Sequence, residues 1–185
     1  LVFGGSKGSR SINRALQAIL PDLLKEAQVI HITGEDNWDE NQEASSGLPN
    51  ELIGDYHPFS FLHAHQMGAA FASADLAVCR AGASTLGELP FFKLPAILVP
   101  YPHAWRYQYT NAEYLVHHGG ALLLKDQELP EKLYPTITSL LHNPKRLTTM
   151  ADAMQKLSHP DAAQKIGDLI ISASKKKGGT TTWSV

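Results

Sequence analysis

The segment from Arg80 to Glu88, RAGASTLGE, contains the residues whose types and spacing are best suited to chemistry. It follows a short apolar run at 76–79, which is typical of a buried strand. A strand that breaks at small residues and opens into a helix presents free backbone N–H groups, and these favour an anion such as a diphosphate. Glu88 lies one turn into that helix, where its carboxylate can accept hydrogen bonds from two vicinal hydroxyls, as a ribose presents. The segment therefore indicates a site for a nucleotide or a nucleotide sugar.

A second glycine-rich turn lies at the start of the sequence. Residues 1–10 read LVFGGSKGSR, an apolar strand followed by a turn, and an amphipathic run comes next. The glycines allow positive φ and close backbone approach, and the Ser6 hydroxyl can donate to a phosphate. The turn is not a P-loop, because no Gly-Lys-Ser/Thr ends it, and it is not a Gly-x-Gly-x-x-Gly dinucleotide fingerprint. On its own it is equally compatible with a strand-to-helix turn that binds nothing.

A third loop, residues 100–112, follows the apolar run 96–99 and combines aromatic with polar side chains. Gln108 and Asn111 are three residues apart, so they share a face at the first turn of the expected helix. Their amides can donate to and accept from sugar hydroxyls, and Trp105 or Tyr107 can stack on a sugar face. The alternative is that the two amides cap the helix while the aromatic side chains pack.

Composition excludes several classes of protein. With 185 residues, 43% of them hydrophobic, the chain is long enough for one domain with a core. A net charge of −2 and an isoelectric point near 6.5 disfavour nucleic-acid binding. Cys79 is the single cysteine, so there is no disulfide framework and a cytoplasmic protein is expected. The nine His residues lack a regular metal-ligand spacing and no Asp-x-Asp motif occurs, so we expect no metal and no cofactor.

Apolar runs alternate with helical patterns, which predicts an α/β domain with a Rossmann-like, mostly parallel sheet and helices on both faces. The expected strands lie at 1–3, 29–33, 52–56, 76–79, 96–99 and 121–124. The expected helices lie at 11–27, 64–72, 84–92, 107–117, 129–141, 144–157 and 160–174, with a short one within 35–50. The candidate residues then follow strands, at the edge where such sheets bind ligands.

The domain is expected to span residues 1–174, and the lysine-rich segment 175–185 is expected to be a flexible tail. Because the sequence starts inside a strand with Leu1 rather than Met, we also expect further sequence upstream. No apolar run reaches the ~20 residues that a membrane-spanning helix needs.

Four motifs together resemble the MurG family, the bacterial undecaprenyl-diphospho-muramoylpentapeptide β-N-acetylglucosaminyltransferases. They are GGSKGSRxxN at 4–13, RAGASTLxE at 80–88, PAILVPYP at 95–102 and QxxNA at 108–112, and they occur in the family's order. The resemblance runs from residue 1 to about residue 174 and covers only the carboxyl-terminal half of the enzyme. It implies one half of a two-domain GT-B glycosyltransferase of family 28, the half that binds most of the nucleotide-sugar donor.

The resemblance also implies roles for individual residues. Ser6 would meet the diphosphate, and the backbone of Ala83, Ser84 and Thr85 would cradle it. Glu88 would accept hydrogen bonds from the ribose hydroxyls. The residues left would contact the base and the sugar: Leu62 through its backbone at the uracil edge, Gln108 at the N-acetylglucosamine hydroxyls with Asn111 nearby, and Arg80 close to the same site.

The implied reaction moves N-acetylglucosamine from UDP-N-acetylglucosamine to the C4 hydroxyl of lipid-linked muramoyl-pentapeptide, the step from lipid I to lipid II in peptidoglycan synthesis. It would invert the anomeric centre without a metal. The catalytic base, the lipid acceptor site and the membrane contact would lie in the absent amino-terminal acceptor domain, so this piece alone is expected to be inactive. The full-length protein would lie on the inner face of the cell membrane.

Two other interpretations stay open. The chain can be the catalytic half-subunit of another UDP-N-acetylglucosamine transferase that works with a separate acceptor subunit. It can also be a non-catalytic Rossmann module that binds a nucleotide or NAD, since Thr33-Gly34-Glu35 places a carboxylate near the end of the second strand. Uridine and adenine nucleotides distinguish these interpretations, because a donor site should bind only the former.

Overall fold

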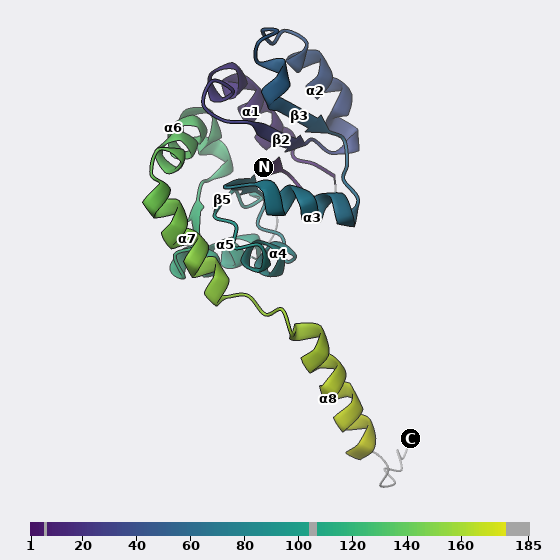
Figure 1. The fold of residues 1–185 in the computed structure, drawn as a ribbon. Coiled ribbons are helices and arrows are strands. Elements are labelled where there is room, and N and C mark those ends of the chain that lie inside the picture. Colours follow the sequence, from purple (N-terminus) through teal and green to yellow (C-terminus); the bar gives the residue numbers. More distant parts are fainter. Residues whose placement is uncertain (6, 104–106, 177–185) are drawn as a thin grey trace.

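A parallel β-sheet with helices on both faces forms the body of the protein (Figure 1). The computed structural model describes residues 1–5, 7–103 and 107–176, and for 175 and 176 only the backbone. The predicted roles of Ser6 and Trp105 therefore lie outside the described residues, as does 177–185 of the expected tail. The strands are β1 Val2–Phe3, β2 Val29–Ile32, β3 Tyr56–Phe59, β4 Ala77–Cys79, β5 Ala96–Leu98 and β6 Ala121–Leu123.

The order of the strands across the sheet is β3-β2-β1-β4-β5-β6, and every pairing is parallel. The chain builds the sheet outward from β1 to β3, then returns to place β4 on the other side of β1 and builds outward to β6. This is the order of a doubly wound sheet, and it confirms the predicted Rossmann-like α/β fold. The direction of winding reverses between β1 and β4.

Alternate residues of each strand are buried on opposite faces, because successive side chains of a strand point to opposite sides. Val2 and Val78 belong to a first hydrophobic cluster, while Phe3 and Cys79 belong to a second. The first cluster packs under α1 Arg10–Leu23 and α6 Leu129–Leu141. The second packs under α3 Ala64–Ser73, α4 Thr85–Phe91 and α5 Tyr107–His117.

The remaining helices complete the two layers. Three short 3₁₀ turns are η1 Glu35–Asn37, η2 Ile53–Asp55 and η3 Asp126–Glu128, and α2 Trp38–Ser45 follows η1. α7 Pro144–Lys156 starts with Asn143 at its N-cap, whose side chain accepts a hydrogen bond from the Arg146 amide. α7 contributes Met150 to the first cluster and Met154 to the second. It therefore belongs to both layers.

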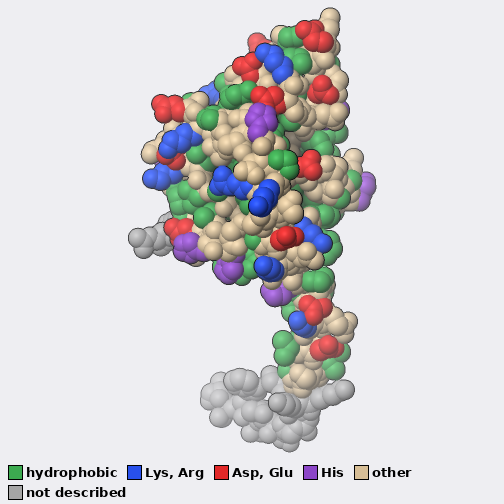
Figure 2. Space-filling model, turned by 60° about the vertical axis from the view of Figure 1, so that its left-hand side comes forward, with side chains coloured by type: hydrophobic (Ala, Val, Ile, Leu, Met, Phe, Trp, Pro, Cys, Tyr) green, Lys and Arg blue, Asp and Glu red, His purple; other side chains and the backbone are tan. Residues whose placement is uncertain are grey.

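α8 Ala162–Lys176 projects away from the body of the protein (Figure 1). Apart from the half-buried Gly167, its residues at 162–174 are exposed, including Ile166, Leu169 and Ile170 at 58%, 68% and 64%. Lys175 and Lys176, expected in the tail, form the end of this helix. None of the helices within the described ranges is both long and apolar enough to cross a membrane. On the face shown in Figure 2, acidic and basic side chains are interspersed.

The prediction of a strand at 52–56 is wrong. Ile53–Asp55 form a 3₁₀ turn with Ile53 exposed, and β3 runs over Tyr56–Phe59, so it shares only Tyr56 with the expected strand. Pro58 pairs with His31 in this strand. A proline is tolerated there because β3 is an edge strand, whose outer N–H groups have no ladder partner to lose. The first helix also ends earlier than expected, at Leu23 rather than at position 27, because a turn follows Leu23.

Candidate functional site

The candidate site lies where the winding of the sheet reverses. β1 and β4 are neighbours, and their carboxyl ends continue into the two glycine-rich turns at 4–9 and 80–84. In open parallel sheets, ligands bind outside the carboxyl ends of the strands at this reversal, because the loops on either side diverge and leave a crevice. The topology therefore brings together two turns that are more than seventy positions apart in the sequence.

A cavity of about 450 Å³ opens beside these turns. Three residues predicted to bind a ligand, Leu62, Ser84 and Glu88, line it together with Gly5 of the first turn. The rest of its wall is apolar or aromatic: Phe3, Ile32, Phe61, Ala64, Met67, Gly68, Phe71 and Phe92. An apolar slot with one carboxylate and a backbone turn at its rim fits a flat base attached to a hydroxyl-bearing sugar.

The first turn is held tightly against the loop that follows β2. Gly8 has a φ of +74°, and a Cβ there would lie 1.9 Å from the Thr33 carbonyl oxygen. Asn37 Nδ2 donates to the carbonyl oxygens of Lys7 and Thr33, both at 3.3 Å. These contacts fix the path of the backbone where it enters α1. Ser9, at the N-cap of the 14-residue helix α1, makes no side-chain cap, so its hydroxyl leaves the backbone N–H groups of the first turn uncapped.

A buried chain of hydrogen bonds supports this loop from behind. The His31 ring has no exposed surface, and burial lowers the pKa of His31 to about 3, so the ring is neutral. Asn13 Oδ1 can only accept, so His31 Nε2 carries the proton and donates at 3.1 Å, and Nδ1 accepts from Tyr56 at 2.9 Å. Asn13 Nδ2 donates in turn to the Thr33 carbonyl oxygen. At the other end of the chain, Asn41 donates to the Tyr56 hydroxyl and accepts from Gln17.

The second turn exposes its small residues. Ala83 and Ser84 are exposed, whereas Thr85 is buried, with its amide and its hydroxyl both bonded to the Gly82 carbonyl oxygen. Of the three residues predicted to cradle a diphosphate, Ala83 and Ser84 are therefore accessible to a ligand, and the Thr85 amide is already bonded. Glu88 is half-buried at the cavity wall.

Gln108 and Asn111 do not line the cavity but hold the loops next to it. The Gln108 Oε1 atom accepts a hydrogen bond from the Tyr101 amide at 2.9 Å. The Asn111 Nδ2 atom donates to the Ala81 carbonyl oxygen at 3.0 Å. Each side chain thus has one polar atom bonded to a loop backbone. Within the described ranges, Gln108 Nε2 and Asn111 Oδ1 make no hydrogen bond.

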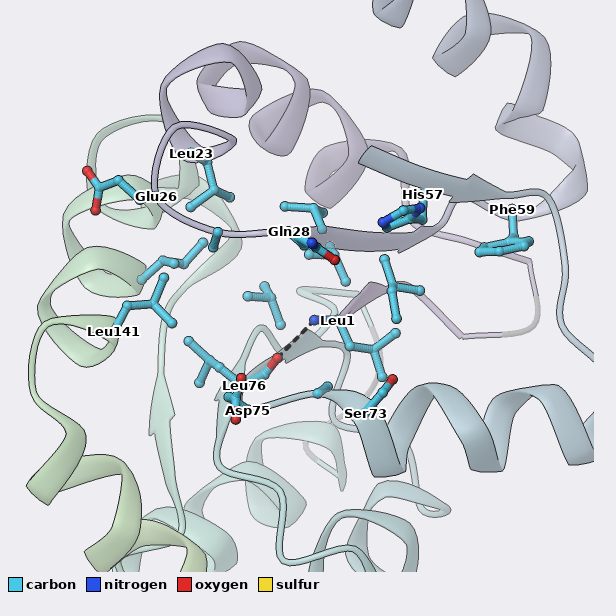
Figure 3. A pocket seen from close by; sticks show the side chains of 17 residues that line it. Leu1, Leu23, Glu26, Gln28, His57, Phe59, Ser73, Asp75, Leu76 and Leu141 are labelled. Carbon is cyan, nitrogen blue, oxygen red and sulfur yellow. Dashed lines mark hydrogen bonds between the residues drawn. The ribbon is translucent and has the colours of Figure 1, made fainter. Parts of the chain in front are cut away.

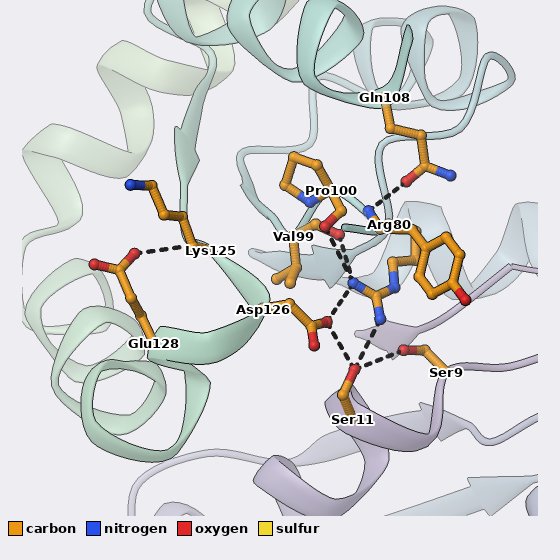
Figure 4. A network of polar contacts seen from close by, with 10 residues as sticks. Ser9, Ser11, Arg80, Val99, Pro100, Gln108, Lys125, Asp126 and Glu128 are labelled. Carbon is orange, nitrogen blue, oxygen red and sulfur yellow. Dashed lines mark hydrogen bonds and ion pairs between the residues drawn. The ribbon is translucent and has the colours of Figure 1, made fainter. Parts of the chain in front are cut away.

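Arg80 is only 8% exposed, and its guanidinium is directed at protein acceptors (Figure 4). Nη1 forms an ion pair with Asp126 at 2.5 Å and donates to the carbonyl oxygens of Val99 and Pro100. Nη2 donates to Ser11 Oγ at 2.7 Å. No local sequence pattern could have predicted that Asp126 and Ser11 bind Arg80, because they lie 46 and 69 positions from it and meet it only in the folded chain.

A larger cavity, about 670 Å³, lies at the opposite edge of the sheet (Figure 3). Its polar side chains include Glu26, His57 and Asp75, and none of the residues predicted to bind a ligand lines it. It adjoins the amino ends of the strands, where the Leu1 nitrogen donates to the Leu76 carbonyl oxygen at 2.9 Å. Despite its size we do not assign the nucleotide site to it, because ligands of such sheets bind at the other edge.

The sheet order and the two converging turns define the class of the protein: a doubly wound α/β domain of the kind found in GT-B glycosyltransferases. The chain belongs to glycosyltransferase family 28, since the model of the "Glycosyltransferase family 28 C-terminal domain" matches residues 1–166. The resemblance indicated by the sequence motifs is confirmed.

The curated relatives are named UDP-N-acetylglucosamine–N-acetylmuramyl-(pentapeptide) pyrophosphoryl-undecaprenol N-acetylglucosamine transferase. The one from Roseiflexus sp. (strain RS-1) is 42% identical, over 92% of this chain and 43% of the relative. The one from Chlorobium limicola is 38% identical, over 95% of this chain and 47% of the relative. The crystal structure of Acinetobacter baumannii MurG has a TM-score of 0.78 at 27% identity, over 92% of this chain and 48% of that one. The chain thus spans about half the length of the relatives it matches.

Proposed function

We propose that this chain is the donor-binding domain of an inverting N-acetylglucosaminyltransferase that uses UDP-N-acetylglucosamine. The observation that carries the proposal is that Gly5, Leu62, Ser84 and Glu88 line one cavity at the sheet reversal. The names of the curated relatives agree with this donor.

In this proposal each part of the donor meets a different part of the site. The uracil enters the apolar slot beside Phe61 and Met67, with the Leu62 backbone at its edge. The ribose hydroxyls donate to the Glu88 carboxylate, whose charge strengthens such hydrogen bonds. The sugar extends toward Gln108 and Asn111, which follow β5 at the same edge of the sheet.

The diphosphate lies between the two turns. We assign its recognition to the backbone of Ala83 and Ser84, to the amino end of α1 and to Ser6. Backbone N–H groups stabilise the negative charge that grows on the departing UDP, which lowers the barrier to transfer. We propose that no metal or other cofactor takes part. In the described ranges no three His, Cys, Asp or Glu side chains gather as a metal-ligand set.

The acceptor in this proposal is lipid-linked muramoyl-pentapeptide, the acceptor given in the names of the relatives. The acceptor site, the catalytic base and the contact with the inner face of the cell membrane are assigned to the other half of a full-length enzyme. No nucleic-acid partner is proposed, in keeping with the net charge of −2.

Parallel calorimetric titrations with UDP, UDP-N-acetylglucosamine and NAD test the proposal, each repeated with EDTA. We expect the two uridine ligands to bind, NAD not to bind, and EDTA to change nothing. Binding of NAD alone would indicate a dinucleotide module instead. Binding of none by the chain joined to its missing half would contradict the donor site, and a loss of binding in EDTA would contradict the metal-free assignment.

A further inference from the structure

Arg80 and Asp126 lie at the centre of a buried polar network that no ligand-binding role requires (Figure 4). Their side chains are 9% and 21% exposed, and the ion pair is 2.5 Å long. The Ser11 hydroxyl joins both partners: it accepts from Arg80 Nη2 and donates to Asp126 Oδ1, each at 2.7 Å. Because the Ser11 proton is directed to Asp126, Ser9 donates the next hydrogen bond, at 3.3 Å.

The network joins three segments that all lie at the carboxyl edge of the sheet. Arg80 follows β4, Ser11 lies in the first turn of α1, and Asp126 begins η3 after β6. The carbonyl oxygens of Val99 and Pro100, which follow β5, accept from the same guanidinium at 3.1 and 3.3 Å. The charge of a largely buried arginine requires a paired carboxylate, so these segments are fixed relative to one another.

The loop after β5 connects this network to the predicted sugar contact. The guanidinium carbon lies 5.3 Å from the centre of the Tyr101 ring. The amide of the same residue donates to Gln108 Oε1 at 2.9 Å. Arg80 therefore restrains the loop through Pro100, and the loop in turn restrains the amide orientation of Gln108, leaving Nε2 as the group available to a hydroxyl.

We propose that Arg80 and Asp126 act as a positioning pair that orients Gln108 toward the sugar of the donor. This inference rests on the proposed function. Arg80 touches no ligand in it, because its Nη atoms already bind protein acceptors. The pair should therefore affect recognition of the sugar much more than recognition of the nucleotide, whose base and ribose depend on Leu62 and Glu88 and whose diphosphate depends on the backbone of the two turns.

The test compares the dissociation constants for UDP and UDP-N-acetylglucosamine in the wild type and in Asp126→Asn, which keeps the shape of the side chain and removes its charge. We expect the UDP constant to stay within about twofold. The constant for UDP-N-acetylglucosamine should rise about five- to tenfold, the size of a weakened charge-assisted hydrogen-bond network. Ser11→Ala removes the hydroxyl that joins Arg80 to Asp126, so it should raise the constant for UDP-N-acetylglucosamine by a smaller factor. This variant replaces Asp126→Asn in the test if Asp126→Asn does not fold.

Two further variants separate positioning from general stability. Glu128→Gln removes the ion pair between Lys132 and the half-buried Glu128, two positions from Asp126, and its amide oxygen can still accept from the Lys125 amide, so both constants should stay unchanged. In a Gln108→Ala background, Asp126→Asn should cause no further loss of sugar recognition, because the pair acts through Gln108. Equal weakening of both ligands, or an unchanged ratio in a folded variant, would overturn the inference. Failure of the wild-type chain to bind any uridine ligand, even when it is joined to the other half of a full-length enzyme, would contradict the proposed function itself.

Discussion

Glu88 is the residue on which recognition of the ribose depends in our proposal. It is half-buried and lines the cavity at the sheet reversal. Glu88→Gln should weaken UDP binding by about 1–3 kcal/mol, because a neutral amide replaces a charged acceptor of two hydroxyl hydrogen bonds. Calorimetric titration with UDP measures the change. Glu51→Gln, at an exposed carboxylate outside the cavity, is the matched control, and equal affinities in the two variants would remove Glu88 from the site.

His31 should make the stability of the domain depend on pH. Its pKa is lowered from 6.5 to about 3 by burial, so only the unfolded chain takes up this proton between those values. The contribution of the neutral His31 ring to the free energy of unfolding is therefore complete above pH 6.5, and it is lost progressively as the pH falls toward 3. Urea unfolding from pH 7 to pH 4 should show a falling midpoint in the wild type and a shallower fall in His31→Gln. The His31 ring resonances should stay constant down to about pH 4, and a midpoint near 6.5 would refute the neutral buried ring.

At the scale of the elements, the two glycine-rich turns should respond differently to an added methyl group. A Cβ on Gly82 would meet nothing within 4 Å, whereas one on Gly8 would lie 1.9 Å from the Thr33 carbonyl oxygen. Gly82→Ala should therefore change the free energy of unfolding by less than about 0.5 kcal/mol, while Gly8→Ala should cost at least about 1 kcal/mol.

The second part of this prediction concerns UDP binding by the Gly82→Ala variant. If the backbone of the turn after β4 closely approaches the diphosphate, Gly82→Ala should weaken UDP binding although the domain stays fully folded. Thermal unfolding and titration of the same sample separate the two effects. Full affinity in the folded Gly82 variant would show that the diphosphate does not approach this turn.

The misplaced strand at 52–56 shows where local sequence signals mislead. Leu52 and Ile53 have the side chains of a strand, and Pro58 argues against one. A strand through Pro58 is possible only because β3 lies at the edge of the sheet, where not every N–H group has to form a hydrogen bond with a neighbouring strand. The buried strands β4 and β5, whose apolar runs end at Arg80 and Pro100, are predicted correctly apart from their end residues. Strand position in a sheet is a tertiary property and is not encoded in a window of five residues.

For the whole molecule, the alternation of strands and helices was sufficient to predict the fold, and the family motifs identified the turns at the carboxyl edge. Glu88, Ser84 and Leu62 meet at one cavity as the topology requires. The network around Arg80 could not be predicted, because Ser11 and Asp126 are 115 positions apart and their polar side chains resemble those of any exposed turn. Its members become neighbours only after the sheet has formed.

The way α7 joins the two layers also determines where the chain can be cut. Met150 and Met154 put α7 in both hydrophobic clusters, whereas every residue of α8 at 162–174 is exposed apart from the half-buried Gly167. A broad-specificity protease in brief digestion should therefore cleave in the segment 157–161 or within α8 and leave a resistant fragment that retains α7. Mass spectrometry of the digest locates the cut, and a resistant fragment that ends before Pro144 would contradict this boundary. For crystallisation or NMR, the smallest durable unit is thus expected to end just after Lys156.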